Sequence, residues 1–439
     1  MSAESATAST SRFRIIAVSV VMAFLLYLDR VCLGEIVKTD AFLEDFATSS
    51  KEEIGEFLGA FFLAYALFQV PAGWLSDRFG GRVMLSLYIV IWSLMTGYSG
   101  MASSLSGLLL ARLALGAAQS GAYSTSSAVI RNWFEPGGRA TASSYISVGG
   151  RLGGTLAPLL TTTFVLWFGG WRSVLILYCG FGIIAACAYW WIVRDRPKDL
   201  GIEDASIASE SEAGESNPRV SFGDGLSLVL AILRSGSLWL NSLAQFCLVF
   251  GWVYLITWLP TYLKEEGIDD VTGSVMVSLV LGIAIPGQLI GGRLGNVAVR
   301  KIGARWGRSL PLAATCFVAG VAYTGCAISD SVWWVVGLCA LVSLMTDIGN
   351  PTVWAFMQDI GGRDTAAVFG WGNMWGNLGA AASAVAVPKL ETLGSGLSIG
   401  TGDDRGATLV FATCASMYFV AALAAFGMNA TKSVRPSCD

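Results

Sequence analysis

Twelve apolar runs, each long enough to form a membrane-spanning helix, constrain this chain more than any other feature of its sequence. Because backbone polar groups find no water in hydrocarbon, such runs predict helices that satisfy their own hydrogen bonds. We therefore predict an all-α membrane protein of twelve transmembrane helices in two pseudo-symmetric six-helix bundles. The runs lie near residues 14–37, 55–77, 83–103, 105–130, 142–166 and 173–193, and then near 239–263, 272–296, 310–328, 332–358, 365–388 and 407–428.

A polar stretch separates the two sets of runs. Residues 194–220 are rich in charged and small polar side chains, which favours a solvated, largely disordered linker. Residues 222–233 are apolar but too short to span, so we expect a helix at the membrane interface. The predicted organisation is a cytoplasmic tail (1–13), an N-terminal bundle (14–193), a cytoplasmic linker with an interfacial helix (194–238), a C-terminal bundle (239–428) and a cytoplasmic tail (429–439).

The residue types present exclude several classes of protein. Only 13% of the residues are charged, against about 25% in a soluble domain. The chain has no histidine, which excludes imidazole metal ligands, histidine-dependent triads and histidine proton relays. Its nine cysteines are scattered without a C-x-x-C pattern, so neither a disulfide framework nor a zinc site is indicated. With no recognisable nucleophile or cofactor motif, we expect no enzyme, no cofactor, no metal and no nucleic-acid partner.

The basic residues predict the orientation. If both termini are inside, 19 of the 28 lysines and arginines lie inside and six outside, a bias that supports cytoplasmic termini in the cell (inner) membrane. The other three, Arg30, Arg112 and Arg151, fall within predicted spans.

Two full charges interrupt the first span. A charge in hydrocarbon costs at least ~3 kcal/mol, so intramembrane charges normally face a protein interior or a wet cavity and mark a transport or relay path. Asp29 and Arg30 are neighbours and point about 100° apart on a helix, so they neutralise each other only partly. Each needs another partner, which is either a ligand or a buried group with a purely structural role.

Two further arginines lie on helices with informative neighbours. Arg112, Gln119 and Tyr123 share one face of the fourth span and would line a cavity. Arginine suits carboxylates because its planar fork donates two parallel hydrogen bonds. Arg151 lies in the glycine-rich segment 149–154, where it either lines the cavity or bonds backbone carbonyls of a closely packed helix.

The second half offers weaker candidates. Tyr254 and Trp258 continue an aromatic stripe that is either a substrate wall or a packing surface. Asn373 and Asn377 share one helix face and need hydrogen-bond partners. These partners are either hydroxyl groups of a ligand or polar groups of a neighbouring helix. Asp347 is the only carboxylate deep in a span of this half, which makes it a candidate for cation coupling or for a structural role.

The segment GWLSDRFGGR at residues 73–82 resembles the signature loop of the major facilitator superfamily, between spans 2 and 3. It departs from the family pattern at Gly81, and its weaker second copy, residues 292–296, ends at Asn296 where an acid is usual. The resemblance implies that Asp77, Arg78 and Arg82 form a gate on the cytoplasmic side. Physically, Asp77 can sit against the positive N-terminus of another helix while the arginines bind carbonyls or carboxylates.

A narrower resemblance covers nearly the whole chain. The segments YLDR (27–30), ARLALGAAQSGAY (111–123), TWLPTYL (257–263) and FGWGNMWGNLGAA (369–381) are similar to the anion:cation symporters, which move sugar acids of the hexuronate, galactonate and glucarate type with protons. The resemblance implies a cationic pocket built by Arg30 and Arg112. The other expected pocket residues are Tyr27, Tyr65, Gln119, Arg151, Tyr254, Trp258, Asn373 and Asn377.

The sequence thus predicts a monomeric secondary transporter in the lipid bilayer that carries a small organic anion by alternating access, in symport with a proton or another cation. An exchanger or facilitator without proton coupling, or a carrier of a different anion, is the alternative. Two remote alternatives are a drug exporter and a non-transporting receptor. A drug exporter would favour acidic residues in its pocket, and a receptor would need a folded output domain. The family usually has a glutamate where Gln119 stands, so coupling is expected to fall to Asp29, with Asp347 the next candidate.

Overall fold

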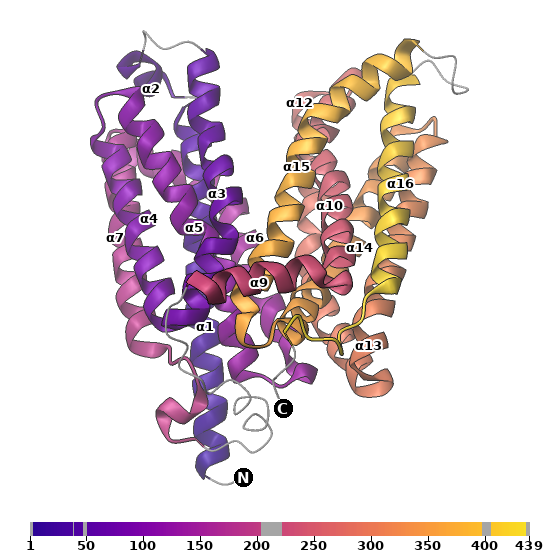
Figure 1. The fold of residues 1–439 in the computed structure, drawn as a ribbon. Helices are drawn as coiled ribbons and strands as arrows, with labels where there is room; N and C mark the ends of the chain where they lie inside the picture. The colour runs from indigo at the N-terminus through magenta and orange to yellow at the C-terminus, as the bar shows by residue number, and fades with distance from the viewer. Residues whose placement is uncertain (1–2, 38, 47–50, 203–221, 397–404, 436–439) are drawn as a thin grey trace.

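The computed structural model describes residues 3–37, 39–46, 51–202, 222–396 and 405–435. All regular structure within these ranges is helical. Two helix bundles lie side by side, meet at the end that carries both chain termini and diverge toward the other end (Figure 1). The predicted all-α architecture of two bundles is confirmed. Most of the predicted linker, residues 203–221, lies outside the described ranges.

The N-terminal bundle contains six long helices. Local signals set several of their ends: Ser104 accepts a hydrogen bond from the Gly107 N–H at the start of one helix, and Gly169 ends the next with a φ of 71°, which favours glycine. The helices are α1 (Ala3–Ile36), α3 (Lys51–Phe79), α4 (Gly81–Met101), α5 (Leu105–Trp133), α6 (Pro136–Phe168) and α7 (Trp171–Ile192); the short α2 (Asp40–Asp45) follows α1, and a 3-10 turn, η1 (Pro197–Leu200), follows α7.

The C-terminal bundle is more segmented than the sequence predicts. The predicted span at 239–263 breaks at Trp258, just before Pro260, and the one at 272–296 breaks at Ile283. Proline lacks the N–H that would continue the first helix. The helices are α10 (Gly236–Thr257), α11 (Leu259–Glu265), α12 (Asp270–Gly282), α13 (Ala284–Ala327), α14 (Val332–Gly361), α15 (Thr365–Gly396) and α16 (Arg405–Gly427), with a 3-10 turn, η3 (Gly362–Asp364), before α15.

Helix α13 holds two predicted spans and reverses inside its own length. Gly303 has φ 76° and ψ 168°, a conformation that strains any residue with a Cβ. Beyond it the chain folds back, since a Cβ on Gly307 would lie 2.5 Å from the backbone of Val299. Gly303 therefore separates the eighth crossing from the ninth.

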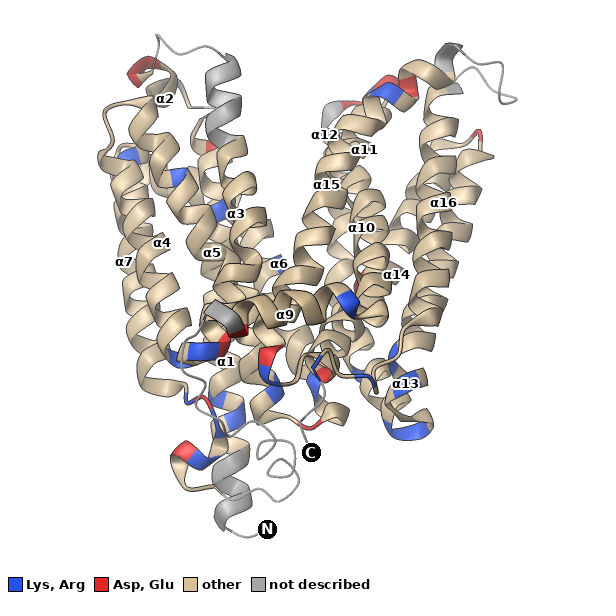
Figure 2. Ribbon diagram, viewed as in Figure 1, with Lys and Arg blue, Asp and Glu red and all other residues tan. Residues whose placement is uncertain are grey.

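Eight stretches of the described chain are long and apolar enough to cross a membrane. Two of them, Val271–Ala327 and Val332–Gly394, each contain two of the predicted spans. Helices α5 and α6 complete the twelve crossings, although serine, glycine and arginine lower their hydropathy. Charged residues gather at the end with the termini and at the far ends, which leaves the middle of the bundles mostly uncharged (Figure 2).

Helix α9 (Phe222–Arg234) lies across both bundles at the end with the termini (Figure 1). Its Leu228 and Ile232 are buried against the bundles, whereas Leu226 and Leu230 are exposed. The structure thus confirms a short helix after the linker, while its place at the membrane interface stays a prediction.

The two bundles touch through glycines at equivalent positions. A Cβ on Gly73 of α3 would lie 2.3 Å from the carbonyl oxygen of Ala366 in α15. A Cβ on Gly292 of α13 would lie 3.0 Å from the carbonyl oxygen of Ala140 in α6. The weak sequence similarity between residues 73–77 and 292–296 therefore corresponds to two equivalent contacts between the bundles.

The first prediction concerns Gly73. Gly73→Ala should lower the population of this closed contact by about tenfold, because overpacking against a backbone costs about 1–3 kcal/mol and 1.4 kcal/mol is a factor of ten. Distances between spin labels on the terminus-side ends of α3 and α15 measure this. Gly59→Ala, in the same helix with open space around it, is the matched control and should leave the distances unchanged. Unchanged distances in Gly73→Ala would contradict the prediction.

Candidate functional site

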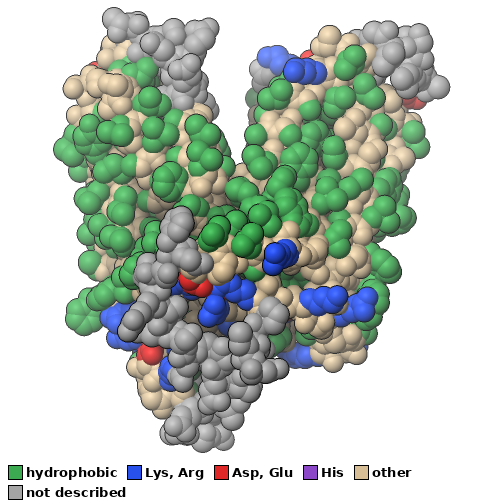
Figure 3. Space-filling model, viewed as in Figure 1, with side chains coloured by type: hydrophobic (Ala, Val, Ile, Leu, Met, Phe, Trp, Pro, Cys, Tyr) green, Lys and Arg blue, Asp and Glu red, His purple; other side chains and the backbone are tan. Residues whose placement is uncertain are grey.

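A cleft separates the bundles on the side away from the termini (Figure 3). Arg30 of α1 lies among aromatic rings of the N-terminal bundle, with its guanidinium 4.9 Å from the Tyr27 ring centroid, 5.1 Å from that of Phe61 and 4.5 Å from that of Tyr65. Its Nε and Nη2 are buried and have no hydrogen-bond partner among the described residues. Three aromatic faces hold this cation in place, and two donors remain available to an anion.

Arg112 of α5 is close to Arg30. Its guanidinium lies 5.3 Å from the centroid of Phe61, so both cations contact the same aromatic ring. Two like charges near each other in a poorly hydrated site repel, and an anion between them relieves that repulsion. The structure thus brings together the two arginines that the sequence predicts.

Asp29 faces the interior of the N-terminal bundle. It is 2% exposed, lies close to Trp92 of α4 and is within electrostatic reach of Arg112. Because neighbouring residues on a helix diverge, Arg30 lies among aromatic rings while Asp29 lies beside Trp92. Asp29 and Arg30 are both within electrostatic reach of Arg112.

Gln119 and Tyr123 occupy the same helix as Arg112. The Gln119 amide is fully buried and donates a 3.2 Å hydrogen bond to the Leu26 carbonyl, which ties α5 to α1. Tyr123 packs edge-on against Trp354 of α14, with ring centroids 4.9 Å apart. Gln119 thus braces two helices, while Tyr123 contacts the opposite bundle.

Arg151 and Asp347 form an ion pair between the bundles. Nη2 of Arg151 in α6 lies 2.7 Å from Oδ1 of Asp347 in α14, and Nε2 of Gln288 lies 2.6 Å from the same oxygen. The Arg151 guanidinium also stacks on Trp252 of α10 at 4.5 Å. The sequence offered Arg151 either a cavity or backbone carbonyls; its partner is instead a carboxylate 196 residues away.

The two asparagines of α15 behave differently. Nδ2 of Asn373 donates to Oε1 of Gln69 at 2.7 Å and to the Tyr65 hydroxyl at 3.4 Å, both on α3. Nδ2 of Asn377 donates to the Asn373 carbonyl one turn earlier, at 2.8 Å. Asn373 is therefore joined to the ring that holds Arg30, whereas the Asn377 amide is bonded within its own helix.

Tyr254 lies inside the C-terminal bundle. It is 1% exposed, and its ring centroid is 5.2 Å from Phe411 and 6.4 Å from Tyr323. The structure favours the packing alternative for Tyr254, which leaves it outside the proposed site. Trp258 is half-buried at the break between α10 and α11, and its indole N–H has no partner among the described residues.

Sequence reasoning missed four residues that contact the predicted site residues: Phe61, Gln69, Trp252 and Gln288. Two of them carried a signal, because Phe61, Tyr65 and Gln69 recur every four residues and so share one face of α3 with a predicted pocket residue. A buried glutamine in an apolar helix also needs a partner. The pairing of Gln288 with Asp347 depends on how α13 packs against α14, which no local pattern reveals.

The bundles are joined at the end with the termini by contacts that we call the inner seam. Both carboxylate oxygens of Asp77 accept backbone N–H groups, from Ala366 and Ala367 at 2.9 Å each, at the N-terminus of α15. At the equivalent place, Oδ1 of Asn296 accepts the Ala140 N–H at 3.2 Å and its Nδ2 lies 2.6 Å from Oγ1 of Thr141, near the start of α6. An amide can serve this second copy because it donates and accepts.

Ion pairs reinforce the inner seam. Asp359 binds Nη1 of Arg139 at 2.6 Å and Nε of Arg308 at 2.7 Å, so arginines from opposite bundles share one carboxylate. Arg78 pairs with Asp364 at 3.2 Å and with Asp224 of α9. Partial burial opposes ionisation of Asp224, but the hydrogen bond from Arg435 and the charge of Arg78 hold its pKa below the usual value. Asp224 therefore stays charged and links α9 to both bundles.

Arg82 does not contact the opposite bundle. Its Nε donates to the Trp190 carbonyl at 2.8 Å, its guanidinium stacks on the Trp190 ring at 4.3 Å, and its N–H donates to Asp195. All three contacts lie within the N-terminal bundle or the segment that follows it. Arg82 braces α4 against α7, and its assignment to the gate is corrected for this reason.

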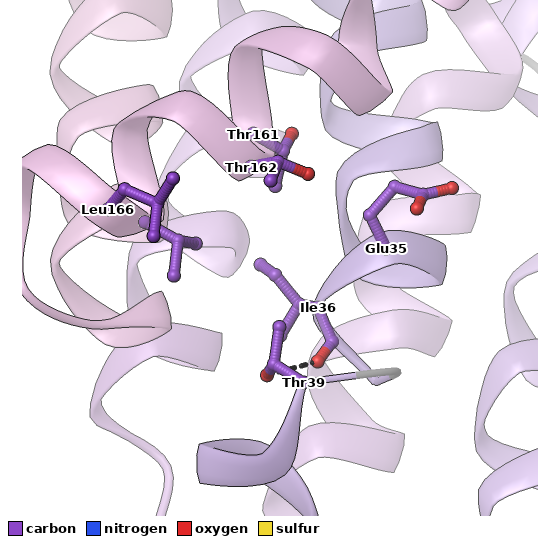
Figure 4. A pocket seen from close by; sticks show the side chains of 7 residues that line it. Glu35, Ile36, Thr39, Thr161, Thr162 and Leu166 are labelled. Atoms are coloured by element: carbon purple, nitrogen blue, oxygen red, sulfur yellow. Dashed lines mark hydrogen bonds between the residues drawn. The ribbon is translucent and has the colours of Figure 1, made fainter.

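Two cavities lie apart from the arginines. One, of ≈ 150 Å³, is lined by residues of α1, α6 and the segment after α1, including Ile36, Thr161 and Leu166; the Glu35 carboxylate is directed away from Leu166 (Figure 4). The other, of ≈ 690 Å³, is lined by residues of α10 with Trp375 of α15. Neither of these two cavities is lined by Arg30, Arg112 or Arg151.

Known proteins resemble this chain in sequence and in fold. Residues 19–384 match the family model of the Major Facilitator Superfamily. The chain is 27% identical to a probable sulfoacetate transporter of Cupriavidus necator, covering 80% of this chain and 81% of that protein, and 24% identical to a hexuronate transporter of Bacillus subtilis, covering 90% and 91%. Its fold is similar to that of the proton:xylose symporter XylE, with a TM-score of 0.66, 14% identity and coverage of 94% and 95%.

The second prediction separates the inner seam from Arg82. Asp77→Ala should open the seam several-fold more often, because losing a helix cap costs about 1 kcal/mol. Arg82→Ala should leave the distance between the bundles unchanged, since its contacts stay in one bundle. Spin-label distances across the seam measure both. Equal effects of the two substitutions would contradict the assignment.

Proposed function

The chain belongs to the major facilitator superfamily, which makes it a multi-pass membrane transporter and not an enzyme, and from this premise we propose that it carries a small organic anion, a sugar acid, by alternating access with a proton. The observation that carries the proposal is the setting of Arg30. A permanently charged guanidinium held on three aromatic rings, with two nitrogens that have no partner among the described residues, needs an anion more than a neutral sugar does.

The surroundings of Arg30 suit a hydroxylated carboxylate. Arg30 and Arg112 take the carboxylate, while the phenols of Tyr27 and Tyr65 and the amide of Asn373 offer hydrogen bonds to hydroxyl groups. Aromatic faces also pack well against the C–H side of a sugar. The hexuronate transporter of Bacillus subtilis, 24% identical, supports this class of substrate.

The inner seam supplies the other half of the transport cycle. With both termini cytoplasmic, as the distribution of basic residues predicts, the cleft opens to the outside and the seam closes the inside. Substrate binding draws the outer halves of the bundles together, and breaking the seam opens the inner side. The site then releases its anion into the cell.

Asp29 is the residue that we assign to proton coupling. Its carboxylate either pairs with Arg112 or accepts a proton when the anion occupies that arginine. Gln119, which stands where related carriers have a glutamate, is a buried amide and cannot take up a proton. This substitution favours a second candidate function, organic-anion exchange without net proton movement.

A thermal-shift screen of the purified protein tests the substrate class. Hexuronates and aldonates should raise the melting temperature, because a ligand that binds only the folded state stabilises it, and their neutral parent sugars should not. Stabilisation by neutral sugars alone would overturn the proposal. Stabilisation by sulfoacetate and not by sugar acids would favour the anion named for the relative in Cupriavidus necator.

The third prediction concerns the geometry of the cation. Arg30→Lys should lose at least about tenfold in affinity for the acid, nearly as much as Arg30→Ala, because lysine keeps the charge but cannot donate from a planar fork or stack on the rings in the same way. Titration of the purified variants measures this. Arg172→Lys, at a partly exposed arginine of α7 that pairs with Asp45, is the control. Wild-type affinity in Arg30→Lys would contradict the role.

The fourth prediction separates symport from exchange. Asp29→Asn should abolish accumulation driven by a proton gradient while it spares counterflow, because the amide cannot carry the proton but leaves the arginines in place. Reconstituted vesicles measure both processes. If Asp29→Asn still accumulates the anion against its gradient, Asp29 is not the coupling residue. If the wild type shows counterflow alone, the protein is an exchanger.

A further inference from the structure

The larger of the two cavities lies between α10 and α15 on the surface of the C-terminal bundle. It measures ≈ 690 Å³, within the range of about 300–1,000 Å³ that is typical of sites for small ligands. Trp239 and Leu243, which line it, are 37% and 44% exposed, so the cavity is open to the outside of the molecule. We call it the α10–α15 groove. The described residues that line it are all uncharged.

The α10–α15 groove opens toward lipid. Its residues belong to two stretches that are apolar enough to cross a membrane, Gly236–Thr257 and Val332–Gly394. It begins at Gly236, the first residue of α10, at the end where the bundles meet, so it lies apart from the cleft. Hydrophobic side chains cover the middle of the face that Figure 3 shows, while charged ones lie toward its two ends. Because exposed apolar side chains of membrane-crossing helices face hydrocarbon, the groove suits an acyl chain better than a water-soluble molecule.

One basic residue, Arg234, lies at the terminus-side end of the groove. Nε1 of Trp239 donates to the Leu233 carbonyl at 3.0 Å. That carbonyl belongs to the peptide unit that joins Leu233 to Arg234, so the Arg234 Cα lies within about 6 Å of an indole nitrogen of the groove. Arg234 is the last residue of α9 and is exposed, and its side chain forms no hydrogen bond or ion pair with any described residue. Its charge is therefore available to a ligand beside the apolar groove.

We propose that the α10–α15 groove binds one anionic phospholipid from the leaflet on the side of the termini, with an acyl chain along the groove and the phosphate on Arg234. A guanidinium donates two parallel hydrogen bonds to a phosphate, and basic pockets between membrane-spanning helices suit anionic head groups. Trp239 and Trp375, whose ring centroids are 5.4 Å apart, lie between the head group and the chain, at the level where tryptophan is favoured. Phosphatidylcholine carries a positive group beside its phosphate, which the guanidinium repels, so Arg234 favours an anionic lipid.

Binding of two lipids with the same acyl chains tests the proposal. The purified full-length protein in neutral detergent is titrated with phosphatidylglycerol or with phosphatidylcholine, and native mass spectrometry counts the bound lipids. The first phosphatidylglycerol should bind about fivefold more tightly than the first phosphatidylcholine, which is the contribution of about one basic residue to binding an anionic head group.

Paired variants locate the site. Arg234→Gln should remove the preference for phosphatidylglycerol, whereas Arg305→Gln, at an exposed arginine that stacks on Trp306, should keep it. Leu243→Trp, which fills the groove, should weaken the binding of both lipids several-fold. Leu423→Trp, at a leucine of α16 that is 75% exposed and lines neither cavity, is the matched control and should leave both affinities unchanged.

Three outcomes would overturn the proposal. Equal affinity of the wild type for the two lipids is the first, and its measurement needs no variant to fold. Loss of the preference in both arginine variants would assign it to the overall charge of this end of the molecule. A dimer that dissociates in Leu243→Trp and not in Leu423→Trp would assign the groove to a second copy of the chain. None of these outcomes changes the function proposed above.

Discussion

A charge withdrawn from water must find a counter-charge or a hydrogen bond, and in this protein that requirement decides where the bundles meet. A membrane supplies no attraction between apolar helices beyond close packing, so polar contacts gain importance. Asp359 pairs with an arginine from each bundle, and Asp77 accepts hydrogen bonds from two backbone N–H groups of the opposite bundle. Removing either acid would leave its partners buried without compensation. The closed end of the molecule is thus also its most polar interior.

The same requirement acts differently around Arg30 and Asp347. There, buried charges are compensated incompletely: Arg30 has rings for neighbours in place of a carboxylate, and Asp347 has one oxygen without a partner among the described residues. Such groups are costly inside a protein, so each calls for an explanation. The inner seam contains such atoms too, among them Nε of Arg78 and Nη1 of Arg308.

Much of this arrangement can be predicted from the sequence, because the signals are local. Apolar runs give the helices, and a signature loop gives the contact of Asp77 with a helix N-terminus. What cannot be predicted depends on which helices meet. The partner of Arg151 lies 196 residues away, and the role of Arg82 follows from the approach of α7. The reversal between the spans near 272–296 and 310–328 is predicted from the sequence, and the structure places it at Gly303.

The reciprocal placement of the helix caps has a consequence for how such a chain is built. The second long helix of each half caps the fifth of the other, with Gly73 and Gly292 in equivalent contacts. That is the pattern of a twofold dimer, in which residue i of one copy meets j of its partner and j meets i. The two halves thus resemble the copies of a homodimer joined in one polypeptide. Because they belong to one chain they need not be identical, and one interface can keep an aspartate while the other holds an asparagine.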